Sequence, residues 1–194
     1  MYDAIDDPYT YENSMVLVNK LDLRDQDDLD DLDAFETEIS NARSGEPLPE
    51  GELDFEHYCA VHHHLFQDVY AWAGRVRTVR ISKQGNPFCY PEHIEAQARK
   101  LFAELKANSF LENLEPDEFS NQAAHFLSGL NAIHAYREGN GRAQLTFLAM
   151  LADNAGHPLD LEALDPPVML DAMIESFEGD EKKLVRAIRE LIAK

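Results

Sequence analysis

The chain has 194 residues, of which 44% are apolar and 28% charged, and its formal net charge is −20. This length and composition are typical of one soluble globular domain with a sizeable core, and they exclude a disordered chain. The negative charge also argues against nucleic acid and anionic membranes as partners, because both would be repelled.

Targeting signals and cysteine content indicate where in the cell the protein is expected. No apolar run approaches the length of a membrane span, and residues 1–7 are acidic, without the apolar stretch of a secretory signal. Cys59 and Cys89 are too few for a disulfide framework or a thiolate metal cage. We therefore expect a cytoplasmic protein, although the sequence is also compatible with delivery to another cell.

The first predicted helix covers residues 25–40. Leu29, Leu32, Phe35 and Ile39 recur there at helical spacing within the densest acidic run of the chain, which predicts an amphipathic helix with an acidic outer face. A Gly- and Pro-containing loop follows. We treat residues 1–194 as a single domain, with an N-terminal helical segment over 1–50 and the core over 51–194.

A helix over residues 55–66 is followed by a predicted β-hairpin. Residues 75–82 alternate charged or polar with β-branched side chains, the period-two pattern of a strand. Residues 83–87 have turn chemistry, and residues 88–90 form the predicted return strand. A solitary hairpin is marginal by itself, so we expect it to lean on helices.

The rest of the chain is predicted to be helical. The expected helices cover residues 91–107, 116–133, 142–155, 168–177 and 181–193, with prolines and glycines at their ends. The predicted fold class is therefore mainly α, with one hairpin.

One loop, residues 134–142, combines several groups that act on phosphates. Its two glycines let the backbone turn tightly and approach a ligand, and the N-terminus of the following helix favours an anion. Arg142 adds a planar cation suited to phosphate, and Glu138 is the hard oxygen ligand that Mg²⁺ takes alongside phosphates. His134 can accept a proton near neutral pH. Together these groups predict phosphoryl or nucleotidyl transfer.

Each of these groups has an ordinary explanation when it stands alone. A Gly-x-Gly is usually a turn, and a single histidine, glutamate or arginine is usually structural or on the surface. Their occurrence within nine residues between two helices favours the functional interpretation. By contrast, His62-His63-His64 does not favour a metal site, because adjacent histidines on a helix point in different directions.

The segment His134-Ala135-Tyr136-Arg137-Glu138-Gly139-Asn140-Gly141-Arg142 resembles the Fic family signature, His-Pro-Phe-x-Asp/Glu-Gly-Asn-Gly-Arg-x-x-Arg. Residues 65–74 and 76–88 are similar to the segment before the family's hairpin and to that hairpin, called the flap. Residues 7–11 and 17–21 resemble the N-terminus of its toxin branch. The resemblance covers nearly the whole chain and implies the Fic fold, a helical bundle with a small β-hairpin flap beside the active-site loop.

The resemblance implies transfer of AMP from ATP to a Ser, Thr or Tyr hydroxyl of a target protein. By position, His134 would be the general base, and Glu138 would hold Mg²⁺ on the α- and β-phosphates. The implied nucleotide-binding residues are Gly139, Asn140, Gly141 and Arg142. The implied target-docking residues of the flap, which would hold the target by strand addition, are Ile81, Ser82, Lys83 and Phe88.

Three positions depart from the signature. Ala135 replaces its Pro and Tyr136 its Phe, changes that we expect to be tolerated. Leu145 stands where the family has a second Arg that binds the γ-phosphate. Loss of such a contact costs roughly 1.5–3 kcal/mol. Two alternatives therefore stay open: a catalytically impaired Fic-fold binding protein, or a Fic enzyme that transfers a different phosphate-containing group.

Leu145 also bears on how the protein is regulated. Many family members are silenced by a Ser/Thr-x-x-x-Glu-Gly/Asn helix whose Glu pairs with that second Arg. No Glu-Gly or Glu-Asn pair of this chain has Ser or Thr four residues earlier. In the toxin branch the motif sits on a small separate antitoxin protein, which is the partner that the resemblance implies.

Overall fold

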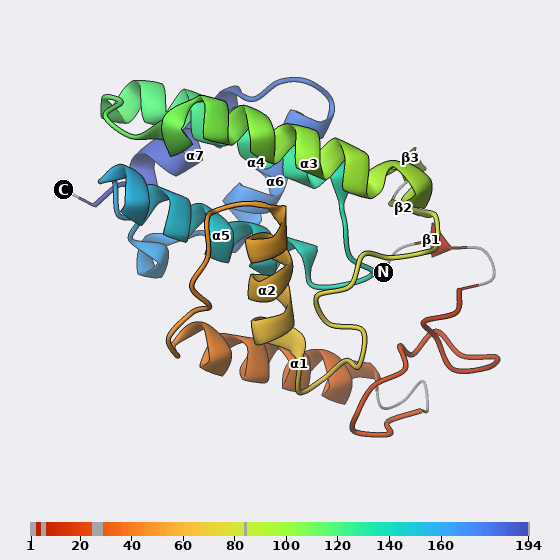
Figure 1. Cartoon of the computed structure of the whole chain (residues 1–194). Coiled ribbons are helices and arrows are strands. Elements are labelled where there is room, and N and C mark those ends of the chain that lie inside the picture. The colour runs from red at the N-terminus through yellow and green to blue at the C-terminus, as the bar shows by residue number, and fades with distance from the viewer. Residues whose placement is uncertain (1–2, 5–6, 25–28, 84, 194) are drawn as a thin grey trace. The chain divides into compact units, whose positions relative to one another are not determined.

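Helices make up most of the structure, a computed structural model that describes the chain except for residues 1–2, 5–6, 25–28, 84 and 194 (Figure 1). One small antiparallel sheet accompanies them. The predicted mainly α class with a hairpin is confirmed. Among the described residues, no helix combines the length and apolar content that crossing a membrane requires.

The chain divides into two compact units. The first contains residues 1–95 and 134–143, and the second contains residues 96–133 and 144–194. The single domain 1–194, with a segment 1–50 and a core 51–194, stays a prediction.

Two helices, α1 (Leu29–Ser44) and α2 (Phe55–Phe66), pack against each other in the first unit. Residues 25–28, where the first helix was expected to begin, lie outside the described residues, and α1 ends four residues later than predicted. Asp54 caps α2 by accepting a hydrogen bond from the backbone N–H of His57, at 2.8 Å.

The sheet of the first unit has three short strands, β1 (Asp3–Ala4), β2 (Ile81–Lys83) and β3 (Asn86–Pro87). β2 lies in the middle and pairs antiparallel with both neighbours. Asp3 is opposite Ser82 on one side, and Ser82 is opposite Pro87 on the other. The hairpin was expected, whereas the pairing of the N-terminal segment with it was not.

The predicted bounds of the hairpin strands were wrong. Residues 75–80 form no strand, because the backbone N–H of Arg77 donates to the carbonyl of Ala135 at 2.9 Å instead of joining the sheet. The return strand lies at 86–87 and not at 88–90, since pairing closes directly after Gly85, which has a φ of +81°. Gln84 of the predicted turn lies outside the described residues.

The second unit is helical. Three of its helices, α4 (Pro116–Ile133), α6 (Pro166–Phe177) and α7 (Lys182–Leu191), pack on one another. Two more, α3 (Pro91–Ala107) and α5 (Asn140–Ala155), begin in the first unit and continue in the second. Short 3-10 turns cover Ser109–Leu111 and Leu161–Ala163. The bounds predicted for α2, α3 and α4 are confirmed, and the other helices differ by a few residues at their ends.

Three aromatic rings meet in the core of the second unit. Phe102 contacts Phe126 and Phe147 edge-on, with ring centroids 5.3 and 5.4 Å apart. All three rings are buried. This apolar packing supports the helices that precede and follow the loop at residues 134–139.

Candidate active site

The loop over residues 134–139 joins the end of α4 to the start of α5 and belongs to the first unit. Gly139 has a φ of +79°, and a Cβ added there would lie 2.5 Å from ring atoms of Phe66. Only glycine therefore fits this position. A Cβ on Gly141 would meet nothing within 4 Å among the described residues, so the first turn of α5 is open to a ligand there.

Asn140 braces the loop from inside. Its Oδ1 accepts a hydrogen bond from the backbone N–H of Tyr136 at 2.9 Å, and its Nδ2 donates to the Tyr136 carbonyl at 2.8 Å. The side chain is buried. The structure thus places the Asn140 side chain on the loop itself, and its backbone at the N-terminus of α5.

Tyr136 is packed against aromatic neighbours. Its ring stacks on the imidazole of His62, with centroids 3.7 Å apart, and lies 5.3 Å from the ring of Tyr58. Within the described part of the chain its buried hydroxyl bonds to no oxygen or nitrogen, and the Cys59 thiol is a weak partner beside it. Burial raises the pKa of this hydroxyl, with smaller contributions from Tyr58 and Cys59. The ring anchors the loop, while the added hydroxyl contributes little.

His62 supports the loop from α2 as a neutral ring. Its Nδ1 accepts from the N–H of Gly74 at 2.9 Å, so its proton sits on Nε2, which donates to the Glu138 carbonyl at 3.0 Å. Burial lowers the pKa of His62 to about 3. The neighbouring His63 and His64 also bond to backbone carbonyls. The histidine triplet is therefore structural, in line with the sequence analysis.

The predicted base, His134, is buried and has a backbone φ of +49°. This left-handed conformation costs a non-glycine residue roughly 1–3 kcal/mol and must be held by its surroundings. The Phe88 ring stacks on the imidazole, with centroids 3.9 Å apart and an interplanar angle of 19°. The Nε of Arg77 donates to the His134 carbonyl at 2.8 Å.

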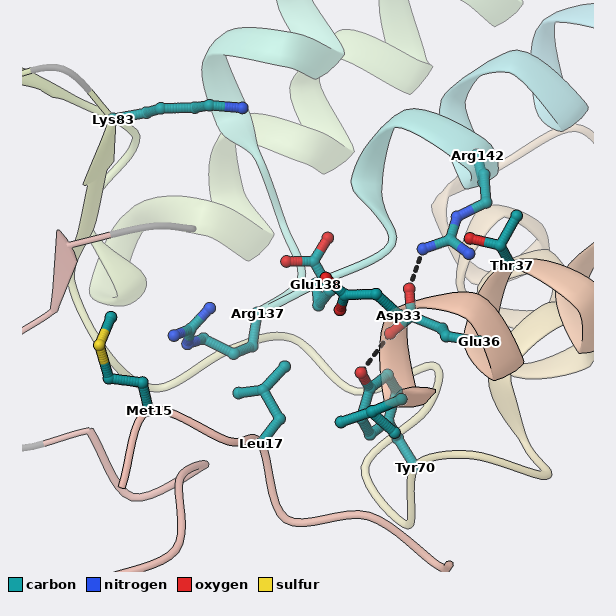
Figure 2. Close-up of a pocket in the computed structure, with 11 residues that line it drawn as sticks. Met15, Leu17, Asp33, Glu36, Thr37, Tyr70, Lys83, Arg137, Glu138 and Arg142 are labelled. Atoms are coloured by element: carbon teal, nitrogen blue, oxygen red, sulfur yellow. Dashed lines mark hydrogen bonds and ion pairs between the residues drawn. The ribbon is translucent and has the colours of Figure 1, made fainter. Parts of the chain in front are cut away.

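Arg142 is held by α1. It forms an ion pair with Glu36 and donates to the Ser40 hydroxyl at 2.9 Å, and its guanidinium lies 4.7 Å from the centre of the Phe66 ring. Figure 2 shows the Glu36 carboxylate between Arg142 and the Tyr70 hydroxyl, which donates to it. Arg142 is thereby fixed in place with a carboxylate against it.

A cavity of about 340 Å³ lies beside these groups, wholly within the first unit (Figure 2). Cationic and acidic side chains face each other across it. Its lining residues are Met15, Leu17, Leu32, Asp33, Glu36, Thr37, Tyr70, Lys83, Arg137, Glu138 and Arg142. The predicted Glu138, Arg142 and Lys83 are thus brought together at one cavity. Such a cavity suits an anionic ligand that also carries a cation.

Glu138 has the properties of a single metal ligand. Its half-buried carboxylate lines the cavity and accepts from the N–H of Gly139 at 3.0 Å, and burial raises its pKa. A bound cation would favour the charged form. The described residues bring together no cluster of three or more His, Cys, Asp or Glu for a metal. A Mg²⁺ ion with one carboxylate and phosphate oxygens would fit that arrangement.

Three further predicted residues belong to the flap or lie beyond the loop. Ile81 is buried, Ser82 is half-buried, and both pair with β1. Leu145 is half-buried on α5, three residues after Arg142, and already belongs to the second unit.

Several residues at the site escaped sequence reasoning. Glu36 and Tyr70 were not expected at Arg142, and Arg137, buried in an ion pair with Asp7 at 2.7 Å, was not assigned a role. No spacing in the sequence connects these positions. Arg77 did leave a weak signal, because it alternates with Val79 and Ile81, which are also buried, although residues 75–80 form no strand.

Comparison with known proteins shows which family the chain resembles. The model of the Fic/DOC family matches residues 52–152. "Probable protein adenylyltransferase y4lH" of Sinorhizobium fredii is 50% identical over 98% of both chains. "Protein adenylyltransferase VbhT" of Bartonella schoenbuchensis is 34% identical over 97% of this chain, which spans 39% of that protein.

A solved structure shares the fold. The N-terminal Fic domain of a VirB-translocated Bep effector protein of Bartonella quintana, with bound ADP, has a TM-score of 0.85 and 24% identity. The match covers 95% of this chain and 94% of that one.

Proposed function

Because the chain belongs to the Fic/DOC family, we propose that it is a protein adenylyltransferase, which transfers AMP from ATP to a Ser, Thr or Tyr hydroxyl of a target protein. Two relatives, matched over nearly the whole chain, carry this activity in their names. The observation that carries the proposal is the cavity where Glu138 and Arg142 meet at the start of α5.

The phosphates of ATP bind at the start of α5. Gly139 and Gly141 let the backbone come close to them, and the N–H groups and dipole at the helix N-terminus favour negative charge. Arg142 supplies a cation at the same end, held there by Glu36 and Ser40. Asn140 contributes through its backbone and by keeping the loop in shape.

The Glu138 carboxylate would hold Mg²⁺ beside these phosphates, together with phosphate oxygens. When bound, the ion would neutralise charge on the phosphates and orient them. Glu138 itself is kept in position by His62, which holds its backbone carbonyl.

His134 acts as the general base. As the hydroxyl oxygen of the target forms a bond to the α-phosphorus of ATP, the bond from that phosphorus to the β-phosphate oxygen breaks and pyrophosphate leaves. The hydroxyl proton passes to a ring nitrogen of His134, because an imidazole is a suitable general base. The target hydroxyl is thereby coupled to AMP.

The flap positions the target. Lys83 lines the cavity, and Phe88 contacts the base itself. β2 already pairs with β1 on one edge and β3 on the other. A target segment that binds by strand addition therefore displaces β1 or adds to an outer strand of the sheet.

The proposed setting is cytoplasmic and toxin-like, with a small antitoxin as a partner. Support comes from the resemblance of residues 7–11 and 17–21 to the toxin branch and from the absence of the inhibitory motif in the sequence. With Leu145 in place of the second Arg, an antitoxin glutamate has to act on another group.

A second candidate function rests on Leu145. If its replacement of an arginine costs the γ-phosphate contact, the protein binds ATP weakly or transfers another phosphate-containing group. Calorimetry with ATP and Mg²⁺ measures whether the protein binds ATP weakly. The intact mass of a modified target identifies the group that was transferred.

The direct test is labelling of a bacterial lysate with ATP and Mg²⁺. ATP labelled at the α-phosphorus should label proteins, whereas ATP labelled at the γ-phosphorus should not. His134→Ala should abolish the signal, and His93→Ala, which changes an exposed histidine, should keep it. Label that persists in His134→Ala would contradict the role of His134, and γ-label in the target would contradict AMP transfer.

A further inference from the structure

Arg77 is a buried guanidinium that joins three backbone segments. Only 1% of this residue is exposed. Its Nε donates to the carbonyl of His134 at 2.8 Å, its Nη1 to the carbonyl of Val79 at 2.7 Å, and its Nη2 to the carbonyl of Cys89 at 2.6 Å. Val79 lies just before β2 and Cys89 just after β3. The planar guanidinium of Arg77 therefore connects both ends of the flap, at Val79 and Cys89, to the backbone of His134.

A second contact links the flap with the same histidine. The Phe88 ring stacks on the His134 imidazole, and the Phe88 N–H donates to the carbonyl of Ile81 at 3.2 Å. The ring that contacts the imidazole is thus fixed to β2. His134 is held by the flap at its carbonyl through Arg77 and at its ring through Phe88.

The conformation of His134 makes this support necessary. A φ of +49° is unfavourable for a residue with a side chain, so it persists only where surrounding contacts impose it. The backbone N–H of Arg77 also donates to the carbonyl of Ala135, the next residue, at 2.9 Å. A shift at the base of the flap is therefore transmitted to the backbone that aims the imidazole.

We propose that Arg77 is a positioning residue that couples the seating of a target segment on the flap to the alignment of His134. This inference rests on the proposed function, in which His134 is the base and the flap holds the target. Lysine keeps the charge at this position but cannot donate hydrogen bonds to three carbonyls from one planar group. The proposed role therefore requires arginine and not lysine.

Arg77→Lys tests the proposal, with Arg75→Lys as the matched control. Arg75 is exposed and two residues away on the same segment. In ¹⁵N NMR spectra of Arg77→Lys, the ring signals of His134 and the amide signals of residues 79–83 and 88–89 should shift together, while the ring of His62 keeps its signals. The rate of AMP labelling should fall about tenfold to a hundredfold, since a misplacement of ~1 Å costs on the order of a hundredfold. Arg75→Lys should stay within about twofold of the wild type in labelling, a change that corresponds to under 1 kcal/mol.

Signals of His134 that stay unchanged in a folded Arg77→Lys protein would overturn the coupling, as would an unchanged labelling rate. A reciprocal variant covers the case in which Arg77→Lys does not fold. His134→Gln removes the ring that stacks on Phe88, and it should shift the Arg77 Nε signal and the amides of Val79 and Cys89, because coupling acts in both directions. Unchanged signals there would also overturn it.

The spectra separate this inference from the proposed function. They need no ATP and no target, so they report the coupling whatever the protein transfers. A wild-type protein that labels nothing would contradict AMP transfer alone. The NMR shifts would still show whether Arg77 positions His134.

Discussion

Glu36 on α1 forms an ion pair with Arg142, the cation proposed to bind the phosphates of ATP. Glu36 is buried, whereas the Arg142 side chain is 31% exposed at the cavity. The nucleotide must therefore bind against a carboxylate that already occupies this arginine. The pair both positions Arg142 and opposes an anionic ligand.

Glu36→Gln should separate these two effects. Glutamine keeps the shape but removes the charge, and Arg142 keeps its contacts with Ser40 and Phe66. We expect ATP with Mg²⁺ to bind tighter by on the order of tenfold, because a like charge close to the phosphates is removed. The free energy of unfolding should fall by ~1–2 kcal/mol as a charge-assisted hydrogen bond is lost.

Calorimetry and denaturant titration measure both quantities. Glu38→Gln is the control, because Glu38 is exposed two residues further along α1. Weaker ATP binding in Glu36→Gln would mean that alignment of Arg142 by Glu36 outweighs the repulsion.

Removal of the buried hydroxyl should affect the stability differently at Tyr136 and at Tyr70. The Tyr136 hydroxyl bonds to no oxygen or nitrogen in the described part of the chain and has only the Cys59 thiol, a weak partner, beside it, so Tyr136→Phe should leave the stability unchanged or raise it by ~0.5–1 kcal/mol. The Tyr70 hydroxyl donates to Glu36, and Tyr70→Phe should cost ~1–2 kcal/mol. Thermal unfolding of the two variants checks this. A marked loss in Tyr136→Phe would reveal a contact of that hydroxyl that stabilises the fold.

The stability should fall as the pH is lowered, through His62. Burial holds its pKa at about 3 in the folded protein, against 6.5 ordinarily. Between these values the unfolded chain binds more protons than the folded one, so stability is lost as the pH falls through this window. At pH 5 this group alone accounts for a loss of ~2 kcal/mol.

Denaturant titrations of the metal-free protein at pH 7 and pH 5 test this dependence. In His62→Gln the difference between the two pH values should shrink by ~2 kcal/mol. His93→Gln alters an exposed histidine and should keep the wild-type difference. An equal difference in His62→Gln and the wild type would assign the acid sensitivity to other groups.

Local patterns in the sequence were enough to predict much of the fold and the cluster at the loop. Helices with proline at the first turn, such as α3 and α4, have the predicted bounds, because start signals and apolar period agree there. Glu138 and Arg142 meet at one cavity because they lie four residues apart at a helix start. Contacts over long sequence separations could not be predicted. The Glu36–Arg142 pair joins residues 106 apart, and β1 pairs with β2 across almost eighty residues, without any short-range signal.

Position 145 offers the sharpest test of how far AMP transfer depends on the missing arginine. Leu145 is half-buried on α5, one turn after Arg142 on the same helix. Leu145→Arg places a guanidinium where the family has one, and a charge-assisted phosphate contact is worth roughly 1.5–3 kcal/mol. AMP labelling with limiting ATP should therefore rise by about tenfold to a hundredfold. Leu145→Gln, polar but uncharged, should give little of this gain, which separates charge from polarity. An equal rate in Leu145→Arg and the wild type would show that Leu145 does not limit the reaction.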